Sequence, residues 1–359
     1  MSKRKKVNFI SKFSRYIFLL FAVTIQHAFA SDCIRRYFKS DSYVCVCNST
    51  YCDGIADPDP IEPTNGTYYM YVSSKENGRL DFLTGKIGEC NRKHNEIVKV
   101  NRSETYQTIL GFGGAFTDAA GINIKKLSPK TQDQLIRTYF GQEGSRYNMG
   151  RVPIGGCDFS TRPYTYDDYP NDYNLSHFSL ALEDYEYKLP ILKKALKLNP
   201  DIKLVTAAWS APPWMKSNNN YYGLGVLKEQ YYQLYSEYLV KFLEAYDKNG
   251  VKIWGMSTGN EPLDAYVPFF PINSLGWLPS TAATWVADYL GPLLANSTYK
   301  NLVLLAMDDQ RFELPWWPDI MFQNKNASDY VHGVAVHWYW DTLPKFEGGF
   351  HHFNMDDYR

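Results

Sequence analysis

The chain lacks the signatures of several common kinds of functional site. Its seven histidines show no paired spacing of metal ligands apart from the adjacent His351 and His352, so we predict no metal site. The glycine-rich run Gly111–Asp118 has neither the Gly-Lys-Ser/Thr ending of a phosphate loop nor the full spacing of a dinucleotide fingerprint. The sequence therefore predicts neither a metal centre nor a bound cofactor.

Basic charge is also scarce beyond the N-terminal segment. Six of the 38 basic residues and none of the 38 acidic residues lie in residues 1–30. The remainder therefore carries 32 basic against 38 acidic residues. Because binding to phosphates needs a basic face, this balance argues against a nucleic acid as the partner.

No hydrophobic run near the N-terminus is long enough to cross a bilayer. The apolar run Tyr16–Ile25 follows a basic stretch and precedes the small-residue pattern Ala28-Phe29-Ala30. This order predicts a secretory signal peptide over residues 1–30, with a signal anchor as the alternative. We therefore expect the chain to enter the secretory pathway.

Cysteine is rare except in one short stretch, and its use agrees with secretion. Cys90 and Cys157 stand alone, whereas four cysteines lie within 20 residues: Cys33, Cys45, Cys47 and Cys52. In an oxidising compartment this cluster predicts two local disulfides, with zinc as the competing interpretation. Six glycosylation sequons are also present, beginning at Asn48, Asn65, Asn101, Asn174, Asn296 and Asn326.

Residues 31–105 have the pattern of a small β segment. Asn65-Gly66 precedes an alternating stretch at 67–72, and Asn77-Gly78 precedes a second one at 79–82. Such pairs of turn residues before alternating stretches indicate strands joined by tight turns. The segment is too short for a complete sandwich, so we expect an incomplete N-terminal β domain.

Residues 106–359 instead alternate apolar strands with helical stretches, which is the pattern of βα units. The predicted helices include 131–139, capped by Ser128-Pro129, and 227–245, whose apolar spacing indicates core packing. The predicted strands are 109–112, 147–153, 202–209, 251–258, 302–307 and 331–338. This pattern predicts an α/β fold of the (β/α)₈ TIM-barrel class with about six of the eight units present.

The residues that follow these strands are the candidates for function, because barrel active sites lie at the C-terminal ends of the strands. They include Asp158, Trp209, Asn260-Glu261, Asp308-Asp309 and His337–Trp340. Acids, amides and indole rings together suit a neutral sugar, since they bind its hydroxyls and stack on its apolar face. Packing explains Trp214 and Trp340 equally well.

Glu261 is the candidate acid catalyst because it follows Asn260 at the end of a buried strand. Partial burial should raise its pKa so that it can protonate a departing oxygen. Asn260 would then contact the 2-hydroxyl of the sugar. Glycoside hydrolysis needs two carboxylates, and only Glu261 has a convincing setting.

With these residues assembled, the chain resembles the lysosomal glucosylceramidases of glycoside hydrolase family thirty, from about Cys33 to Trp340. The motifs that carry the resemblance are 44–48 with Cys52, 111–120, 151–153, 157–160, 260–262, 308–311 and 336–339. One departure is local, since the family's Glu-Asn-Glu-Pro is Gly259-Asn260-Glu261-Pro262 here.

The resemblance implies disulfides Cys33–Cys45 and Cys47–Cys52, a free thiol at Cys157 and an acid/base role for Glu261. It also implies a sugar pocket built by Asp158, Phe159, Trp209, Asn260, Arg151, His337, Trp338 and Tyr339. The implied substrate is β-glucosylated ceramide at an anionic membrane surface, with a lipid-binding activator protein as partner. The implied location is the lysosome, with secretion as the alternative.

In that family the nucleophilic Glu follows the strand after the His-Trp-Tyr segment, and we find no equivalent here. The late acids Asp341, Glu347, Asp356 and Asp357 follow no strand-like run. We therefore expect this chain, as written, to be inactive. The alternatives are a sugar- or lipid-binding product without catalysis, and a related retaining glycosidase with another sugar specificity.

Overall fold

The computed structural model describes residues 33–53, 62–75, 78, 80–88 and 98–339. The predicted signal peptide, Cys90, Trp340 and the four late acids lie outside these residues. None of the helices in the described ranges has the length and apolar character that a membrane span requires.

The N-terminal part consists of two antiparallel hairpins, as the sequence predicts. Strands β1 (Arg35–Tyr37) and β2 (Tyr43–Cys45) form the first, and β3 (Thr67–Val72) and β4 (Asp81–Lys86) form the second. The predicted strand 79–82 is displaced because Gly78 and Leu80 have positive φ angles and belong to the turn. Both implied disulfides are present, with Cα–Cα distances of 5.0 Å for Cys33–Cys45 and 4.2 Å for Cys47–Cys52.

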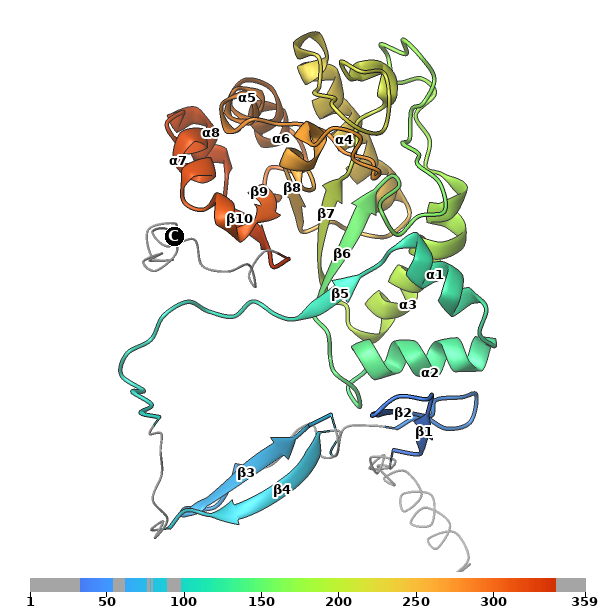
Figure 1. Ribbon diagram of the computed structural model, residues 1–359, viewed down its shortest axis with the longest axis vertical. Helices are drawn as coiled ribbons and strands as arrows, with labels where there is room; N and C mark the ends of the chain where they lie inside the picture. The colour runs from blue at the N-terminus through green and yellow to red at the C-terminus, as the bar shows by residue number, and fades with distance from the viewer. Residues whose placement is uncertain (1–32, 54–61, 76–77, 79, 89–97, 340–359) are drawn as a thin grey trace, which may run out of the picture.

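The second part is a curved parallel sheet with helices on its outer face, which confirms the TIM-barrel class (Figure 1). The strands lie in chain order, so each βα unit places its strand beside the previous one. They are β5 (Gly113–Ala115), β6 (Met149–Ile154), β7 (Lys203–Ala208), β8 (Gly255–Ser257), β9 (Val303–Gln310) and β10 (Gly333–His337).

Helices follow the strands in the order that a barrel requires. They are α1 (Asp118–Lys125), α2 (Pro129–Phe140), α3 (Leu189–Leu198), α4 (Tyr232–Lys248), α5 (Pro279–Trp285), α6 (Gly291–Ala295), α7 (Trp316–Phe322) and α8 (Lys325–Tyr330). Short π-helical turns precede α3 and α6, at η1 (Asp184–Lys188) and η5 (Val286–Leu290). Short 3₁₀ turns occupy η2 (Pro213–Met215), η3 (Glu229–Tyr231), η4 (Pro262–Tyr266) and η6 (Arg311–Glu313).

Two of the predicted helices hold with small shifts. The side chain of Ser128 accepts a hydrogen bond from the N–H of Thr131 at 3.3 Å, which is the predicted cap of α2. The helix expected from residue 227 begins at Tyr232, because η3 precedes it. Its buried face packs against the sheet, which confirms the core role that its spacing indicates.

The first predicted strand, 109–112, is wrong, since β5 starts at Gly113. Ile109, Leu110 and Phe112 are exposed. A Cβ atom at Gly113 would lie 1.8 Å from the carbonyl oxygen of Met149, so only glycine allows β5 to approach β6 at this point. The glycine-rich run thus serves strand packing.

Candidate active site

A cavity of about 340 Å³ lies at the C-terminal ends of the strands. Its lining comes from the ends of β5, β6, β7, β8 and β10: Ala115, Thr117, Arg151, Pro153, Asp158, Phe159, Trp209, Asn260, Glu261, His337 and Tyr339. Every residue predicted for the sugar pocket is in this lining except Trp338. That side chain is exposed and stacks on Tyr339, with 5.1 Å between ring centroids.

Glu261 follows β8 in a left-handed backbone conformation, with φ of 44°. Its N–H donates to the carbonyl oxygen of Asp308 at 3.0 Å, which fixes this unfavourable conformation. Its Oε1 atom accepts a hydrogen bond from Gln310 Nε2 at 2.7 Å and lies 2.8 Å from His337 Nδ1. The carboxylate is therefore held in one orientation from β9 and β10.

His337 lies between two carboxylates. Its Nδ1 contacts Glu261, and its Nε2 lies 3.0 Å from Asp308 Oδ1. Burial alone would lower the pKa of His337, but the hydrogen bonds and charges of Asp308 and Glu261 raise it to about 9. The imidazole is therefore a cation at neutral pH and donates from both nitrogens.

The expected rise in the pKa of Glu261 is not found. Burial does raise this pKa, but the hydrogen bond and positive charge of His337 outweigh burial and leave it below the ordinary value. The predicted rise is wrong because the cation His337, which is distant in sequence, lies beside Glu261 in the fold.

Arg151 joins the other side of the pocket to the same group. Its Nη2 donates to Asn260 Oδ1 at 2.8 Å and to Asp308 Oδ2 at 2.7 Å, and its guanidinium lies 4.8 Å from the centroid of the Trp209 ring. Asp308 is 4 % exposed, and burial by itself would raise its pKa. Arg151 and His337 outweigh burial and leave the pKa below the ordinary value, so Asp308 remains ionised. Asn260 thus uses its oxygen on Arg151. Its NH₂ group donates one N–H to Glu261 Oε2 at 3.4 Å, which leaves the second N–H for a ligand.

The end of β9 departs from the predicted strand. The sequence places Asp308 and Asp309 after the strand, whereas β9 continues to Gln310. Met307 and Asp308 have positive φ angles, and the register with β10 shifts between Ala335 and Val336. A β-bulge of this kind reorients side chains, and here it turns Asp308 toward Arg151.

Residues 255–259 also match the Gly-x-Ser-x-Gly pattern of serine hydrolases. Ser257 is buried and its hydroxyl donates to Asp308 Oδ2 at 2.6 Å. It is therefore a structural donor to Asp308 and not an exposed nucleophile.

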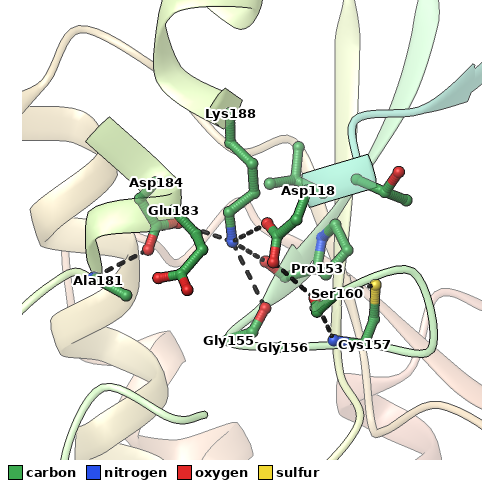
Figure 2. A network of polar contacts seen from close by, with 12 residues as sticks. Asp118, Pro153, Gly155, Gly156, Cys157, Ser160, Ala181, Glu183, Asp184 and Lys188 are labelled. Atoms are coloured by element: carbon green, nitrogen blue, oxygen red, sulfur yellow. Dashed lines mark hydrogen bonds and ion pairs between the residues drawn. The ribbon is translucent and has the colours of Figure 1, made fainter. Parts of the chain in front are cut away.

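Asp158 lies exposed in the loop after β6, where burial of part of the carboxyl and the charge of Glu261 raise its pKa. The buried Lys188 holds this loop, as Figure 2 shows. Its Nζ atom lies 2.8 Å from Asp184 Oδ1 and 3.9 Å from Asp118 Oδ1, and it donates to the carbonyl oxygens of Pro153 and Gly155 at 3.3 and 3.4 Å.

Ser160 completes this support of the loop. Its hydroxyl donates to Asp118 Oδ2 at 2.6 Å and accepts the N–H of Cys157 at 3.0 Å. Cys157 is a buried free thiol, as predicted, and burial raises its pKa to about 11. It therefore stays protonated and unreactive.

Trp214 is a core residue. It is 8 % exposed, its Nε1 donates to the carbonyl oxygen of Asp167 at 3.0 Å, and its ring contacts Tyr173 and Tyr231. Packing, one of the two explanations that the sequence leaves open, is the correct one here.

Sequence reasoning did not assign roles to Gln310, Lys188 and Asp118. Gln310 lies within the motif 308–311, so its position directly after two strand-end acids was an available signal. Asp118 lies within the motif 111–120, which was an available signal of the same kind. Lys188 had no local signal, because a lysine on a helical stretch is normally exposed.

The chain is similar to known glycoside hydrolases. The model of the glycosyl hydrolase family 30 TIM-barrel domain matches residues 109–355. Lysosomal acid glucosylceramidase of Mus musculus and putative glucosylceramidase 2 of Caenorhabditis elegans are each 40% identical to it, over 332 and 334 residues. Each alignment covers 91% of this chain and 64% of the relative, so the chain spans less than two thirds of their length.

Solved structures agree with these matches. SrfJ from Salmonella typhimurium superposes with a TM-score of 0.67 at 29% identity, over 72% of this chain and 57% of that one. An endo-beta1,6-glucanase superposes with a TM-score of 0.65 at 26% identity, over 76% of this chain and 60% of that one. The chain therefore belongs to glycoside hydrolase family 30.

Proposed function

We propose that this chain carries the sugar-binding and acid/base part of a retaining glucosylceramidase, an enzyme that releases glucose from glucosylated ceramide. The observation that carries the proposal is the position of Glu261, held by His337 and Gln310 at the end of β8, in the cavity of a family 30 barrel. The names of the two relatives given above support this substrate.

In the proposed reaction the protonated form of Glu261 gives its proton to the glycosidic oxygen while a second carboxylate attacks the anomeric carbon. The carbon–oxygen bond to ceramide breaks, and a glycosyl ester forms. Glu261 then takes a proton from water as the water oxygen displaces the ester, so the configuration of the sugar is retained.

The neighbouring residues have matching roles in sugar binding. Asp158 accepts hydrogen bonds from sugar hydroxyls, and Trp209 stacks on the apolar face of the ring. The NH₂ group of Asn260, which lies 3.4 Å from Glu261 Oε2, donates to the 2-hydroxyl. Tyr339 and Phe159 complete the wall of the cavity.

We assign the nucleophile to none of the described residues. Apart from Glu261, Asp158 is the carboxylate that lines the cavity within the described ranges, and we assign it to hydroxyl binding. The second candidate function, already named from the sequence, is binding of the glycolipid without hydrolysis.

Small anions distinguish these functions, because azide can replace a missing carboxylate nucleophile. The purified chain is incubated with 2,4-dinitrophenyl and 4-methylumbelliferyl β-glucosides, with and without azide. We expect α-glucosyl azide from both substrates, since azide attacks the anomeric carbon and displaces the phenolate. In Glu261→Gln the methylumbelliferyl reaction should fall about 100-fold or more, because only that leaving group needs a proton.

The outcomes separate the hypotheses. Release of β-glucose without azide would show that a carboxylate of the chain serves as nucleophile, because direct attack by water would invert the anomeric configuration. Binding of glucosylsphingosine with no product under either condition would support the binding protein. Neither binding nor product would contradict both. β-Xylosides and β-galactosides used in parallel test the remaining alternative of another sugar specificity.

We further propose that the chain meets its substrate at an anionic membrane, with a lipid-binding activator protein, in the lysosome or after secretion. An exposed apolar loop supports contact with lipid: Phe269 is 96 % exposed and Val267 is 48 % exposed. Leu224, on a separate segment, is 56 % exposed and lines the same surface hollow as Phe269. The loop follows η4, which begins directly after Glu261. The six sequon asparagines are exposed, as glycosylation requires.

A further inference from the structure

A buried carboxyl group with no hydrogen-bond donor lies behind the pocket. Glu313, at the end of η6, is 0 % exposed, and neither of its carboxylate oxygens has a hydrogen-bonding donor among the described residues. An ionised carboxylate in this position would lose its hydration with nothing to replace it. The loss of hydration therefore favours the protonated form of Glu313.

The neighbour that can receive the proton is Asp309. Asp309 is 2 % exposed, and it accepts the N–H of Gln310 on Oδ1 at 2.8 Å and the N–H of Leu263 on Oδ2 at 3.1 Å. It is thus the better acceptor of the two, and the side chains of Asp309 and Glu313 share a hydrogen bond. The N–H of Gln310, which donates to Asp309, also lowers the pKa of Glu313, but burial and the charge of Asp309 outweigh it.

A second pair of carboxyl groups connects this one to the pocket. Asp264, in η4, hydrogen-bonds the side chain of Glu261, and its backbone N–H donates to the carbonyl oxygen of Glu261 at 3.1 Å. Glu261 already accepts from Gln310 and faces the His337 cation, so it is the acceptor and Asp264 the donor.

We propose that Asp264 and Glu313 are neutral carboxylic acids that donate hydrogen bonds to Glu261 and Asp309, which makes Asp264 a positioning residue for the acid/base Glu261. Only the role given to Glu261 rests on the proposed function. For Glu313 the proton follows from full burial and from the absence of a donor among the described residues. For Asp264 it follows from the hydrogen bond between its side chain and Glu261, because two carboxyl groups can share a hydrogen bond only if one of them holds a proton.

The electrostatics of the surrounding groups agree with this arrangement. Burial and the charges of Glu261 and Asp309 raise the pKa of Asp264 to about 8, opposed by His337. Burial and Asp309 raise the pKa of Glu313 to about 9. Other charged groups from every neighbouring element face Asp264 and Glu313. They are Glu261 from the loop after β8, Asp308 and Asp309 from β9, and His337 from β10, while Arg151 of β6 lies beyond Asp308.

The sign of the pH effect follows from these raised values. Each group binds its proton more tightly in the folded chain than in the unfolded chain. Their contribution to stability is therefore complete below the ordinary pKa of a carboxyl group, declines as pH rises, and is lost above the folded values of about 8 and 9. At alkaline pH the two new charges would repel Glu261 and Asp309.

The test measures the full 359-residue chain, with Asp264→Asn, Glu313→Gln and the double variant. Asparagine and glutamine supply an N–H donor without a proton to lose. Glu244→Gln, at an exposed position of α4, is the matched control. Between pH 5 and pH 9 we expect the Tm of the wild type to fall by about 3 °C or more beyond the fall seen in the double variant. The Tm of Glu244→Gln should fall as much as that of the wild type.

Infrared spectroscopy gives a second readout on the wild type alone. At pH 7 we expect the carbonyl stretch of protonated carboxyl groups, reduced in each single variant and lost in the double variant. Absence of this band from the wild type would overturn the proposal even if the variants failed to fold. An unchanged band in the double variant, or the same Tm slope in both chains, would also overturn it. Neither readout needs turnover, so a failure of the glucosidase proposal would leave these results unaffected.

Discussion

Beneath β6 the carboxylates of Asp118 and Asp184 share the buried cation Lys188, whereas beside β9 Asp309 and Glu313 have no salt-bridge partner within the described ranges. Both groups support loops of the same cavity. The first neutralises its charge with a lysine, and the second does so with protons. The comparison teaches that one barrel can bury acids in two ways, of which only the second depends on pH near neutrality.

The largest effect on stability is expected from replacing Lys188. In Lys188→Met the two carboxylates stay buried without their cation, so we expect a loss of about 3–5 kcal/mol in the free energy of unfolding. Urea denaturation at pH 7 measures it. Lys194→Met is the control, because its partner Asp133 is exposed and such pairs contribute at most about 1 kcal/mol.

The double variant Lys188→Met, Asp184→Asn sharpens this result. If charge imbalance causes the loss, removing one carboxylate with the lysine should recover part of it, since coupled pairs are not additive. Losses that simply add would contradict the electrostatic explanation and point to packing of the lysine stem.

A second test moves a charge on the β9 side. In His337→Gln the cation beside Glu261 is gone, and burial then raises the pKa of Glu261. The pH profile of azide-dependent cleavage of the methylumbelliferyl glucoside should extend to higher pH than in the wild type, because that step needs a protonated Glu261.

The matched control for that test is His332→Gln, since His332 accepts the N–H of Leu304 away from the cavity. It should leave the profile unchanged. If His337→Gln also leaves the profile in place, His337 does not set the pKa of Glu261.

The smallest losses of stability are expected where one serine hydroxyl donates a hydrogen bond to a buried carboxylate. Ser160→Ala removes a donor to Asp118, and Ser257→Ala removes a donor to Asp308. Each should cost about 1–2 kcal/mol in urea denaturation, because each leaves a buried carboxylate one hydrogen bond short. Ser328→Ala, at a more exposed bond in α8, is the control and should cost less.

Local patterns predicted much of the frame correctly. The alternation of residues 67–72 matches β3, and the Ser128-Pro129 pair caps α2 as expected. Strand ends at Asp158, Trp209 and Glu261 predicted one shared cavity, because parallel strands of a barrel present their ends on one face.

Two sequence predictions were wrong because they depend on contacts between distant residues. The strand at β9 is longer than its apolar run because a bulge continues the pairing through Asp308 and Asp309. Trp338 follows a strand end like its neighbours yet lies outside the cavity lining. Neither outcome is visible in spacing, since both depend on how β9 and β10 meet.

The sequence by itself determined the order of strands and helices, the disulfide cluster and the residues that reach the strand ends, because these depend on period and local chemistry. Only the tertiary structure decided which groups carry charge. The pKa of Glu261 depends on His337, and the proton on Glu313 depends on Asp309. The burial of the Lys188 cation depends on Asp118 and Asp184. Charge state is set by neighbours in space and by loss of water, and no local pattern encodes either.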